Sequence, residues 1–137
     1  DSTNPEGISA IAQQFITGVL AHMQELCVLF NPSINSFKRL IPHFEAPVFI
    51  CWGDKNRSAL VRIPQASSAK GKRAELRNPD PLCNPYLAFS ALLISGMQAI
   101  YEGYEPVEPI NYNLYAASDD QLQQQEIEQL PSNLPHA

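Results

Sequence analysis

The sequence predicts an α+β fold, in which helices pack with a small number of strands. Two long segments, 8–30 and 85–103, carry apolar residues at helical spacing. Three shorter segments between them, 48–52, 57–64 and 73–77, have the composition or the alternation of β-strands. With 137 residues, 45% of them hydrophobic, the chain has the size and core content of one domain or of part of one.

Apolar residues recur in steps of three and four along residues 8–30 for about six turns, the spacing of an amphipathic helix. Asn31-Pro32 ends this predicted helix, because proline cannot continue the hydrogen-bond ladder and restricts the residue before it. The following segment, 33–47, is punctuated by Pro42 and Pro47. Glu45 lies in the predicted loop from Pro42 to Pro47, either as a solvated carboxylate or as one held on a stiff flap, where it could orient or deprotonate a substrate.

Residues 48–64 predict a β-hairpin. Two β-rich runs, 48–52 and 57–64, flank residues 53–56, which have turn chemistry. Arg57 and Arg62 differ in parity, so a regular strand would direct them to opposite faces. They can share one site only if a bulge or a bend lies between them.

The second long helix has recognisable ends. Asn84 can cap its first turn, Pro85 suits the first helical position, and Gly103 suits the C-cap. Residues 88–99 carry no charge, so we expect this helix to be buried on most sides. A capping-box pattern predicts a last, short helix over residues 118–130.

The charges are segregated along the chain. All nine basic residues lie between Lys38 and Arg77 together with only three acids, which gives this segment a net charge of +6. The other 97 residues hold eleven acids and no Lys or Arg, and the whole chain carries −5. Solubility alone would intersperse the signs, so the middle third is predicted to meet a small, densely charged anion. Nucleic acid fits poorly, because the chain is net negative and lacks interleaved aromatic and basic residues.

Residues 73–77 are the centre of this basic segment. If they form a strand, Arg73, Glu75 and Arg77 share one face and the two apolar residues between them share the other. Such a row is either a surface ion-pair ladder, worth about 0–1 kcal/mol per pair, or a phosphate site. In a phosphate site the arginine forks grip oxyanions and the carboxylate holds a divalent metal. The charge segregation favours the phosphate site.

The cysteines and the hydropathy predict a cytoplasmic protein. Cys27 and Cys51 have apolar neighbours and no Cys-x-x-Cys pair occurs, which is typical of free, mostly buried thiols in a reducing compartment. The chain has no apolar run long enough to span a bilayer, and its first residues do not resemble a signal peptide. We therefore expect no membrane partner.

Six short motifs occur in order and are specific as a set. They are Asn35-Ser36-Phe37-Lys38-Arg39-Leu40, Phe44-Glu45-Ala46-Pro47, Asn56-Arg57-Ser58-Ala59, Arg62-Ile63-Pro64, Arg73-Ala74-Glu75-Leu76-Arg77 and Pro79-Asp80-Pro81-x-x-Asn84-Pro85-Tyr86. The set resembles the C-terminal part of the catalytic domain of glutamine synthetase, from about Gly7 to about Asn113 with a weaker echo to the end. The resemblance implies a mainly antiparallel, curved sheet flanked by helices. It also implies that 1–137 is part of that domain, with an N-terminal domain and the first half of the catalytic domain lying before it.

The resemblance implies an ATP-dependent ligase that forms homo-oligomers. ATP phosphorylates the side-chain carboxylate of glutamate with Mg²⁺ or Mn²⁺ present, and ammonia then displaces phosphate from the glutamyl phosphate. Two alternatives stay open: a ligase that joins glutamate to another amine, and a non-catalytic homologue that only binds anions. Glu45 and Glu75 argue against the second alternative, because carboxylates beside the arginines weaken anion binding. The chain alone is expected to be inactive.

Residue by residue, the resemblance assigns roles to eight side chains. Arg39 matches the arginine that holds the glutamyl group and its phosphate, and Glu45 the flap glutamate that takes a proton from ammonium. Arg57 matches the arginine on the transferring phosphoryl group, and the glutamate site comprises Arg39, Glu45, Arg57 and Arg77. Nucleotide and phosphate contacts fall on Arg57, Arg62, Lys70 and Arg73, and the metal on Glu75.

Two positions depart from the pattern of the family. Asn78 stands where many members have an aromatic residue before Pro-Asp-Pro. Tyr115 lies where some bacterial members carry an adenylylated tyrosine, but Ala116-Ala117-Ser118 follows it instead of an acidic-proline context. The sequence therefore does not predict that regulation.

Overall fold

The computed structural model of the chain describes residues 8–42, 46–68, 71–118, 122 and 127–137. The helices and strands are α1 (Ala10–Ala21), α2 (Met23–Phe30), α3 (Ile34–Arg39), β1 (Phe49–Asp54), β2 (Ala59–Ile63), β3 (Glu75–Leu76), α4 (Pro85–Glu102), η2 (Leu114–Ala116) and η3 (Leu134–His136). Helices and a small mixed sheet together confirm the α+β class.

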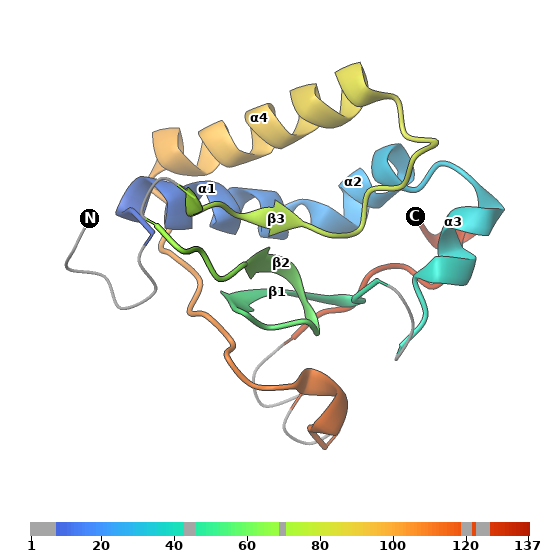
Figure 1. Cartoon of the computed structure of the whole chain (residues 1–137). Helices are drawn as coiled ribbons and strands as arrows, with labels where there is room; N and C mark the ends of the chain where they lie inside the picture. Colours follow the sequence, from blue (N-terminus) through green and yellow to red (C-terminus); the bar gives the residue numbers. More distant parts are fainter. Residues whose placement is uncertain (1–7, 43–45, 69–70, 119–121, 123–126) are drawn as a thin grey trace.

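Helix α1 lies between α4 and the sheet, as Figure 1 shows. Its backbone meets that of α4 directly at Gly18, where an added Cβ would lie 2.2 Å from the carbonyl oxygen of Ser95 and 2.6 Å from Cβ of Ala99. Small residues are therefore required on both helices at this crossing. The buried core continues from α1 and α2 to the strands, with Trp52 and Leu60 almost fully enclosed.

The predicted helix over residues 8–30 is divided into two. Helix α1 ends at Ala21, His22 has non-helical backbone angles (φ −107°, ψ 9°), and α2 begins at Met23. The apolar stripe continues through the break, with Val19, Met23 and Cys27 all buried, so the stripe does not reveal the interruption. Helix α2 ends before Pro32, as predicted.

Helix α3 is an element for which the sequence made no prediction. Its N-terminus is a capping box in which Ser33 Oγ accepts from the Ser36 backbone N–H at 3.1 Å and Ser36 Oγ accepts from the Ser33 N–H at 3.2 Å. Serine takes the place of the usual Glu or Gln at the second position, so the pattern is easily overlooked. The helix matters for function because Arg39 is its last residue.

The sheet is mixed, with strand order β1-β2-β3. The predicted hairpin is wrong, since β1 and β2 run parallel, with Phe49 opposite Ala59 and Asp54 opposite Ile63. Residues 55–58 do not form a tight turn, because the Asn56 side chain donates to the carbonyls of Ile110 at 2.6 Å and Tyr112 at 2.9 Å. These bonds hold the connection against residues 110–112. Strand β3 is antiparallel to β2 and only two residues long.

The predicted helix over residues 118–130 is wrong at its end. Residues 127–130 lie along the free edge of β1, where Ile50 N–H donates to Glu128 O and Leu130 N–H donates to Val48 O, both at 2.8 Å. Pairing with an open strand edge satisfies these backbone groups in place of helical bonds. Residues 119–121 and 123–126 of the predicted helix lie outside the described residues.

Helix α4 has the predicted ends but not the predicted burial. Asn84 Oδ1 accepts from the N–H groups of Tyr86 and Leu87, and Gly103 adopts the left-handed C-cap conformation. Only one face meets α1, and large apolar side chains remain exposed on the rest of the helix. They are Tyr86, Leu87, Phe89, Leu93, Ile94, Met97 and Tyr101. The absence of charge therefore does not indicate burial on most sides in this chain.

Two further features bear on the sequence predictions. Cys27 and Cys51 are buried, as predicted, and carry free thiols. Among the described residues, no helix combines the length and the apolar character needed to cross a membrane.

Candidate functional site

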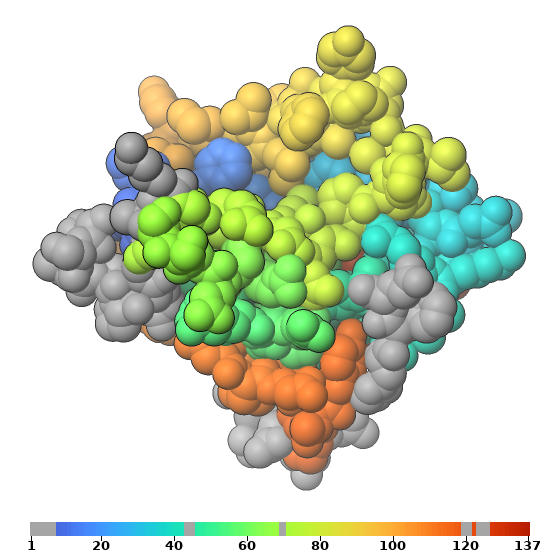
Figure 2. Space-filling view, viewed as in Figure 1, coloured from blue at the N-terminus to red at the C-terminus, as the bar shows by residue number. Residues whose placement is uncertain are grey.

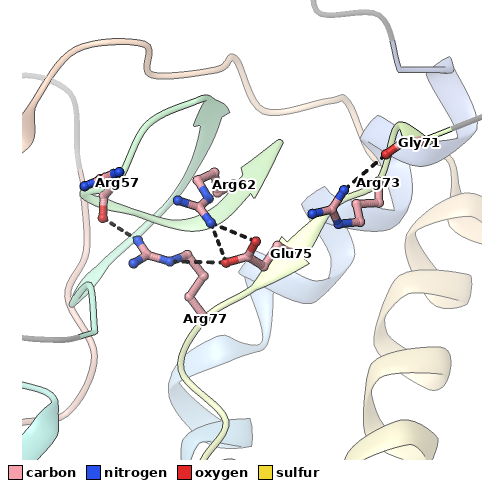
Figure 3. A network of polar contacts seen from close by, with 6 residues as sticks. All are labelled: Arg57, Arg62, Gly71, Arg73, Glu75 and Arg77. Atoms are coloured by element: carbon pink, nitrogen blue, oxygen red, sulfur yellow. Dashed lines mark hydrogen bonds and ion pairs between the residues drawn. The ribbon is translucent and has the colours of Figure 1, made fainter. Parts of the chain in front are cut away.

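A salt bridge between neighbouring strands lies at the centre of the basic segment. Arg62 of β2 and Glu75 of β3 are register partners in the antiparallel pair. The Arg62 Nη2 atom donates to both carboxylate oxygens of Glu75, each at 2.9 Å (Figure 3). The pair is partly covered, with exposed side-chain fractions of 25% for Arg62 and 34% for Glu75. Cross-strand pairing therefore assembles this pair from residues 13 positions apart.

Arg77 joins the same carboxylate from the other side. Its Nε lies 3.6 Å from Glu75 Oε1, and its Nη1 donates to the backbone carbonyl of Arg57 (Figure 3). Burial, followed by the positive charge of Arg62, lowers the pKa of Arg77 below its ordinary value, while Glu75 acts in the opposite direction. Arg57, Arg62 and Arg77 thus carry three positive charges around one carboxylate, an excess that an anion would offset. We call these four residues the arginine cluster.

Arg57 belongs to the loop before β2 and not to the strand. The predicted strand over residues 57–64 therefore begins only at Ala59, and the alternation of strand faces that would have separated Arg57 from Arg62 does not apply. The Arg57 side chain is exposed and lines an open pocket of about 600 Å³ that Lys55 also lines. Figure 2 shows yellow-green residues of the 71–77 segment at the surface of the chain.

Two guanidinium donors near this face lack a partner among the described residues. They are the Nε atoms of Arg62 and Arg39, and both are buried. Buried donors are normally hydrogen-bonded, and an exception indicates a missing ligand, ion or water. Oxyanion ligands such as phosphate or carboxylate would satisfy these two N–H groups.

Arg39 is held beside the cluster through the backbone. From the end of α3 its Nη2 donates to the carbonyls of Asn78 at 2.5 Å and Pro79 at 3.0 Å, directly after Arg77 in the chain. These two bonds hold the guanidinium through its Nη2 atom. Arg39 is thus tied to the backbone directly after Arg77, the last residue of the arginine cluster.

Arg73 does not join the cluster. It is exposed and donates to the carbonyl of Gly71 at 3.2 Å, apart from the other charged groups in Figure 3. The predicted grouping of Arg73, Glu75 and Arg77 is therefore correct for the last two and wrong for Arg73, because β3 is too short to carry the alternation back to residue 73. Two further predicted residues, Glu45 and Lys70, lie outside the described residues.

Glu75 has the chemistry of one metal ligand. A carboxylate offers about four lone-pair sites, so Glu75 can bind a cation while it accepts from Arg62. Oxygen ligands suit Mg²⁺ and Mn²⁺, and Mg²⁺ commonly takes one or two carboxylates together with phosphate and water. The described part of the chain contains no group of three His, Cys, Asp or Glu residues that could hold a metal ion.

Sequence reasoning missed the buried amides beneath this surface. Asn31 and Asn78 have no exposed area, and the Asn31 Nδ2 donates to the same Asn78 carbonyl that holds Arg39, at 2.7 Å. In the sequence, Asn31 is recognisable only as the residue before a helix-ending proline.

The mixed sheet and its arginine cluster define part of an enzyme domain that handles phosphate or carboxylate groups. The chain belongs to the family described as "Glutamine synthetase, catalytic domain", which matches residues 1–137. The resemblance inferred from the six motifs is therefore confirmed.

Similar proteins agree with this family. Glutamine synthetases of Methanosarcina mazei and Thermotoga maritima are each 44% identical over the whole chain, which covers 30% and 31% of those proteins. The glutamine synthetase of Pyrococcus furiosus is 46% identical over 96% of the chain, again 30% of that protein. A solved structure described as "Apo GmaS without ligand" has 35% identity and a TM-score of 0.77, covering 97% of this chain and 29% of its own. The chain thus spans about a third of the length of these relatives.

Proposed function

We propose that the complete protein, to which this chain contributes the C-terminal part of a catalytic domain, is a glutamine synthetase. It joins ammonia to the side-chain carboxylate of L-glutamate through a glutamyl phosphate, producing glutamine, ADP and phosphate. The arginine cluster is the observation that carries the proposal. A family member without catalysis would have no use for Glu75 among three arginines, since a carboxylate weakens anion binding.

The arginines act by holding charge in place. Phosphoryl transfer places negative charge on the oxygens of the transferring group, and fixed cations stabilise that charge without having to reorganise. Arg57 contacts the transferring phosphoryl group, and Arg62 directs its unpartnered Nε towards the nucleotide phosphates. Arg77, fixed to Glu75 and to the Arg57 carbonyl, contacts both substrate and phosphate. Lys70 and Arg73 complete the nucleotide contacts.

Glutamate and ammonia are handled by two other residues. Arg39, whose guanidinium is held in place by the carbonyls of Asn78 and Pro79, holds the glutamyl group. Glu45, which lies between two prolines in the sequence, closes the site and accepts a proton from ammonium, which frees the nitrogen lone pair for attack. Closure also excludes water, which would otherwise hydrolyse the glutamyl phosphate.

Glu75 would hold Mg²⁺ or Mn²⁺ together with ligands from the rest of the complete protein. When bound, such an ion neutralises charge on phosphate oxygens during transfer. The described residues contain no group of three such ligands, and we propose that further ligands come from the rest of the complete protein. The complete catalytic domain is proposed to form a mainly antiparallel, curved sheet, in a cytoplasmic homo-oligomer with an additional N-terminal domain.

The test is phosphate release by the complete protein with ATP and glutamate, first with ammonia and then with a panel of small amines. Release driven best by ammonia, with glutamine as product, supports the proposal. Release driven only by another amine would retain the phosphate chemistry and replace the product. Absence of release with every amine would favour an anion-binding homologue.

A further inference from the structure

We propose that Asn31 is a positioning residue for the glutamate site, acting through the Asn78 carbonyl on Arg39. The inference rests on the proposed function, because it takes the glutamyl group to be the ligand of Arg39. No motif that carries the family resemblance includes Asn31. Its role follows from a buried network that joins the C-terminus of α2, the C-terminus of α3 and the segment after β3.

The Asn78 carbonyl is shared by two donors. Asn31 Nδ2 donates to it at 2.7 Å and Arg39 Nη2 at 2.5 Å. An oxygen with two lone pairs can accept both bonds, and its direction is then determined by both donors. The carbonyl therefore links the buried Asn31 amide to the Arg39 guanidinium, and its orientation determines the plane of the guanidinium that binds a ligand.

Asn31 is itself rigidly held. It is fully buried at the C-cap of α2, and its Oδ1 accepts from Cys27 Sγ and from Asn78 Nδ2, each at 3.4 Å. The neighbouring backbone adds a further tie, since the Asp80 N–H donates to the Phe30 carbonyl at 3.1 Å. Asn31 therefore has little freedom to turn away from the Asn78 carbonyl.

The geometry separates the two amides of this pair. Asn31 supports the carbonyl that holds Arg39, whereas the Asn78 side chain contacts only Asn31 Oδ1 and, at 3.4 Å, Met23 Sδ. The Asn78 side chain therefore holds Asn31 in place, so changes at Asn78 would also act on Arg39. Cys51→Ala is the control for lost stability, because Cys51 is buried in β1 and its thiol interacts with the backbone of Leu60 and not with this network.

Loss of the Asn31 donor should act on glutamate and not on ATP. Misplacement of a binding group by about 1 Å can cost about a hundredfold, so Asn31→Leu is expected to raise KM for glutamate about tenfold or more. The KM for ATP should change by less than about twofold, since the nucleotide contacts lie on other residues. Cys51→Ala should lower the melting temperature while leaving the KM for glutamate within about twofold of wild type.

The experiment measures both KM values, kcat and the melting temperature of the complete enzyme for wild type, Asn31→Leu and the control Cys51→Ala. A rise in glutamate KM confined to Asn31→Leu supports the inference. An equal rise in both variants, or an equal change in the KM for glutamate and for ATP, would show a structural role and overturn it. If Asn31→Leu does not fold, Asn31→Ser, whose shorter side chain cannot reach the carbonyl, replaces it with the same expected outcomes.

A double-mutant cycle with Arg39→Lys adds a second, independent test. If Asn31 acts through Arg39, then Asn31→Leu should change the glutamate KM by less than about twofold once Arg39 is Lys. Additive effects would overturn the inference. If the wild type is active and the effects of the two substitutions are additive, this inference alone is rejected. If the wild type is inactive with every amine, the proposed function and this inference are rejected together.

Discussion

Glu75→Gln tests whether the central carboxylate is a metal ligand or only a partner in surface ion pairs. Glutamine keeps the size and one oxygen acceptor of Glu75 but loses its charge. Glu75 meets Arg62 Nη2 at 2.9 Å and Arg77 Nε at 3.6 Å, and about a third of its side chain is exposed. Solvent screens pairs of this kind, and each is worth about 0.2–1 kcal/mol. The free energy of unfolding should therefore fall by only about 1–2 kcal/mol.

Catalysis should suffer far more than stability. Loss of a charged ligand weakens the hold on the divalent ion and on the phosphate charge that it neutralises, and we expect kcat/KM to fall by about a hundredfold or more. A hundredfold loss corresponds to about 2.7 kcal/mol in the transition state. The concentration of Mg²⁺ or Mn²⁺ that gives half-maximal rate should also rise.

The assay is phosphate release by the complete enzyme over a titration of each metal, with thermal unfolding measured on the same samples. Glu105→Gln, which neutralises an exposed carboxylate outside the arginine cluster, is the matched control and should behave as wild type. If Glu75→Gln lowers only the melting temperature and leaves the metal titration unchanged, Glu75 is merely an ion-pair partner and the metal role is refuted.

Three further predictions concern stability and follow from local geometry. Gly18→Ala should lower the free energy of unfolding by about 1–3 kcal/mol, because the added Cβ would lie 2.2 Å from the Ser95 carbonyl oxygen. Gly71→Ala is the control, because a Cβ at position 71 has room. Equal shifts of the melting temperature in the two variants would contradict this packing. Asn84→Ala should cost about 1 kcal/mol through loss of the N-cap of α4, and wild-type stability in denaturant would contradict the cap. Burial raises the pKa of Cys51 to about 12, so as pH rises the Cys51 thiol ionises first in the unfolded chain. The free energy of unfolding should therefore fall above about pH 9, by about 1.4 kcal/mol per pH unit. In chemical denaturation at pH 8 and 10, Cys51→Ala should lose this part of the slope, and an unchanged slope would reject the assignment.

Local signals predicted the ends of the elements well. Asn84, Pro85 and Gly103 mark α4 through bonds and angles that depend on neighbouring residues alone, and the structure has all three in the predicted roles. The break at His22 could not be predicted, because the buried stripe keeps its phase on both sides of it. The burial of α4 was overestimated, because a lack of charged residues does not show how many other elements pack against the helix.

Pairing between distant segments was the main source of error. The parallel course of β1 and β2 depends on bonds from Asn56 to residues 110–112, more than 50 positions away, and no local pattern reports them. The extended segment 127–130 likewise depends on the free edge of β1. Composition and alternation specify what a segment can form, whereas its partner is set by the tertiary fold.

The proximity of charged side chains was predicted better than the sheet that carries them. Glu75 and Arg77 share a face because they lie two positions apart in extended chain, and Arg62 reaches them through strand register. Arg73 was misplaced because the strand is shorter than its alternating pattern. The role of Asn31 could not be read from the sequence, since it depends on a backbone carbonyl 47 positions away.

The most direct test of the account follows oxygen from glutamate to phosphate. The complete protein would be supplied with ATP, ammonia and glutamate labelled with ¹⁸O in its side-chain carboxylate, and the released phosphate examined by mass spectrometry. If a glutamyl phosphate forms, one labelled oxygen bridges glutamate and phosphorus and leaves with the phosphate when ammonia attacks. The account therefore predicts one ¹⁸O in each phosphate released together with glutamine. Phosphate that carries only oxygen from water or ATP would contradict it.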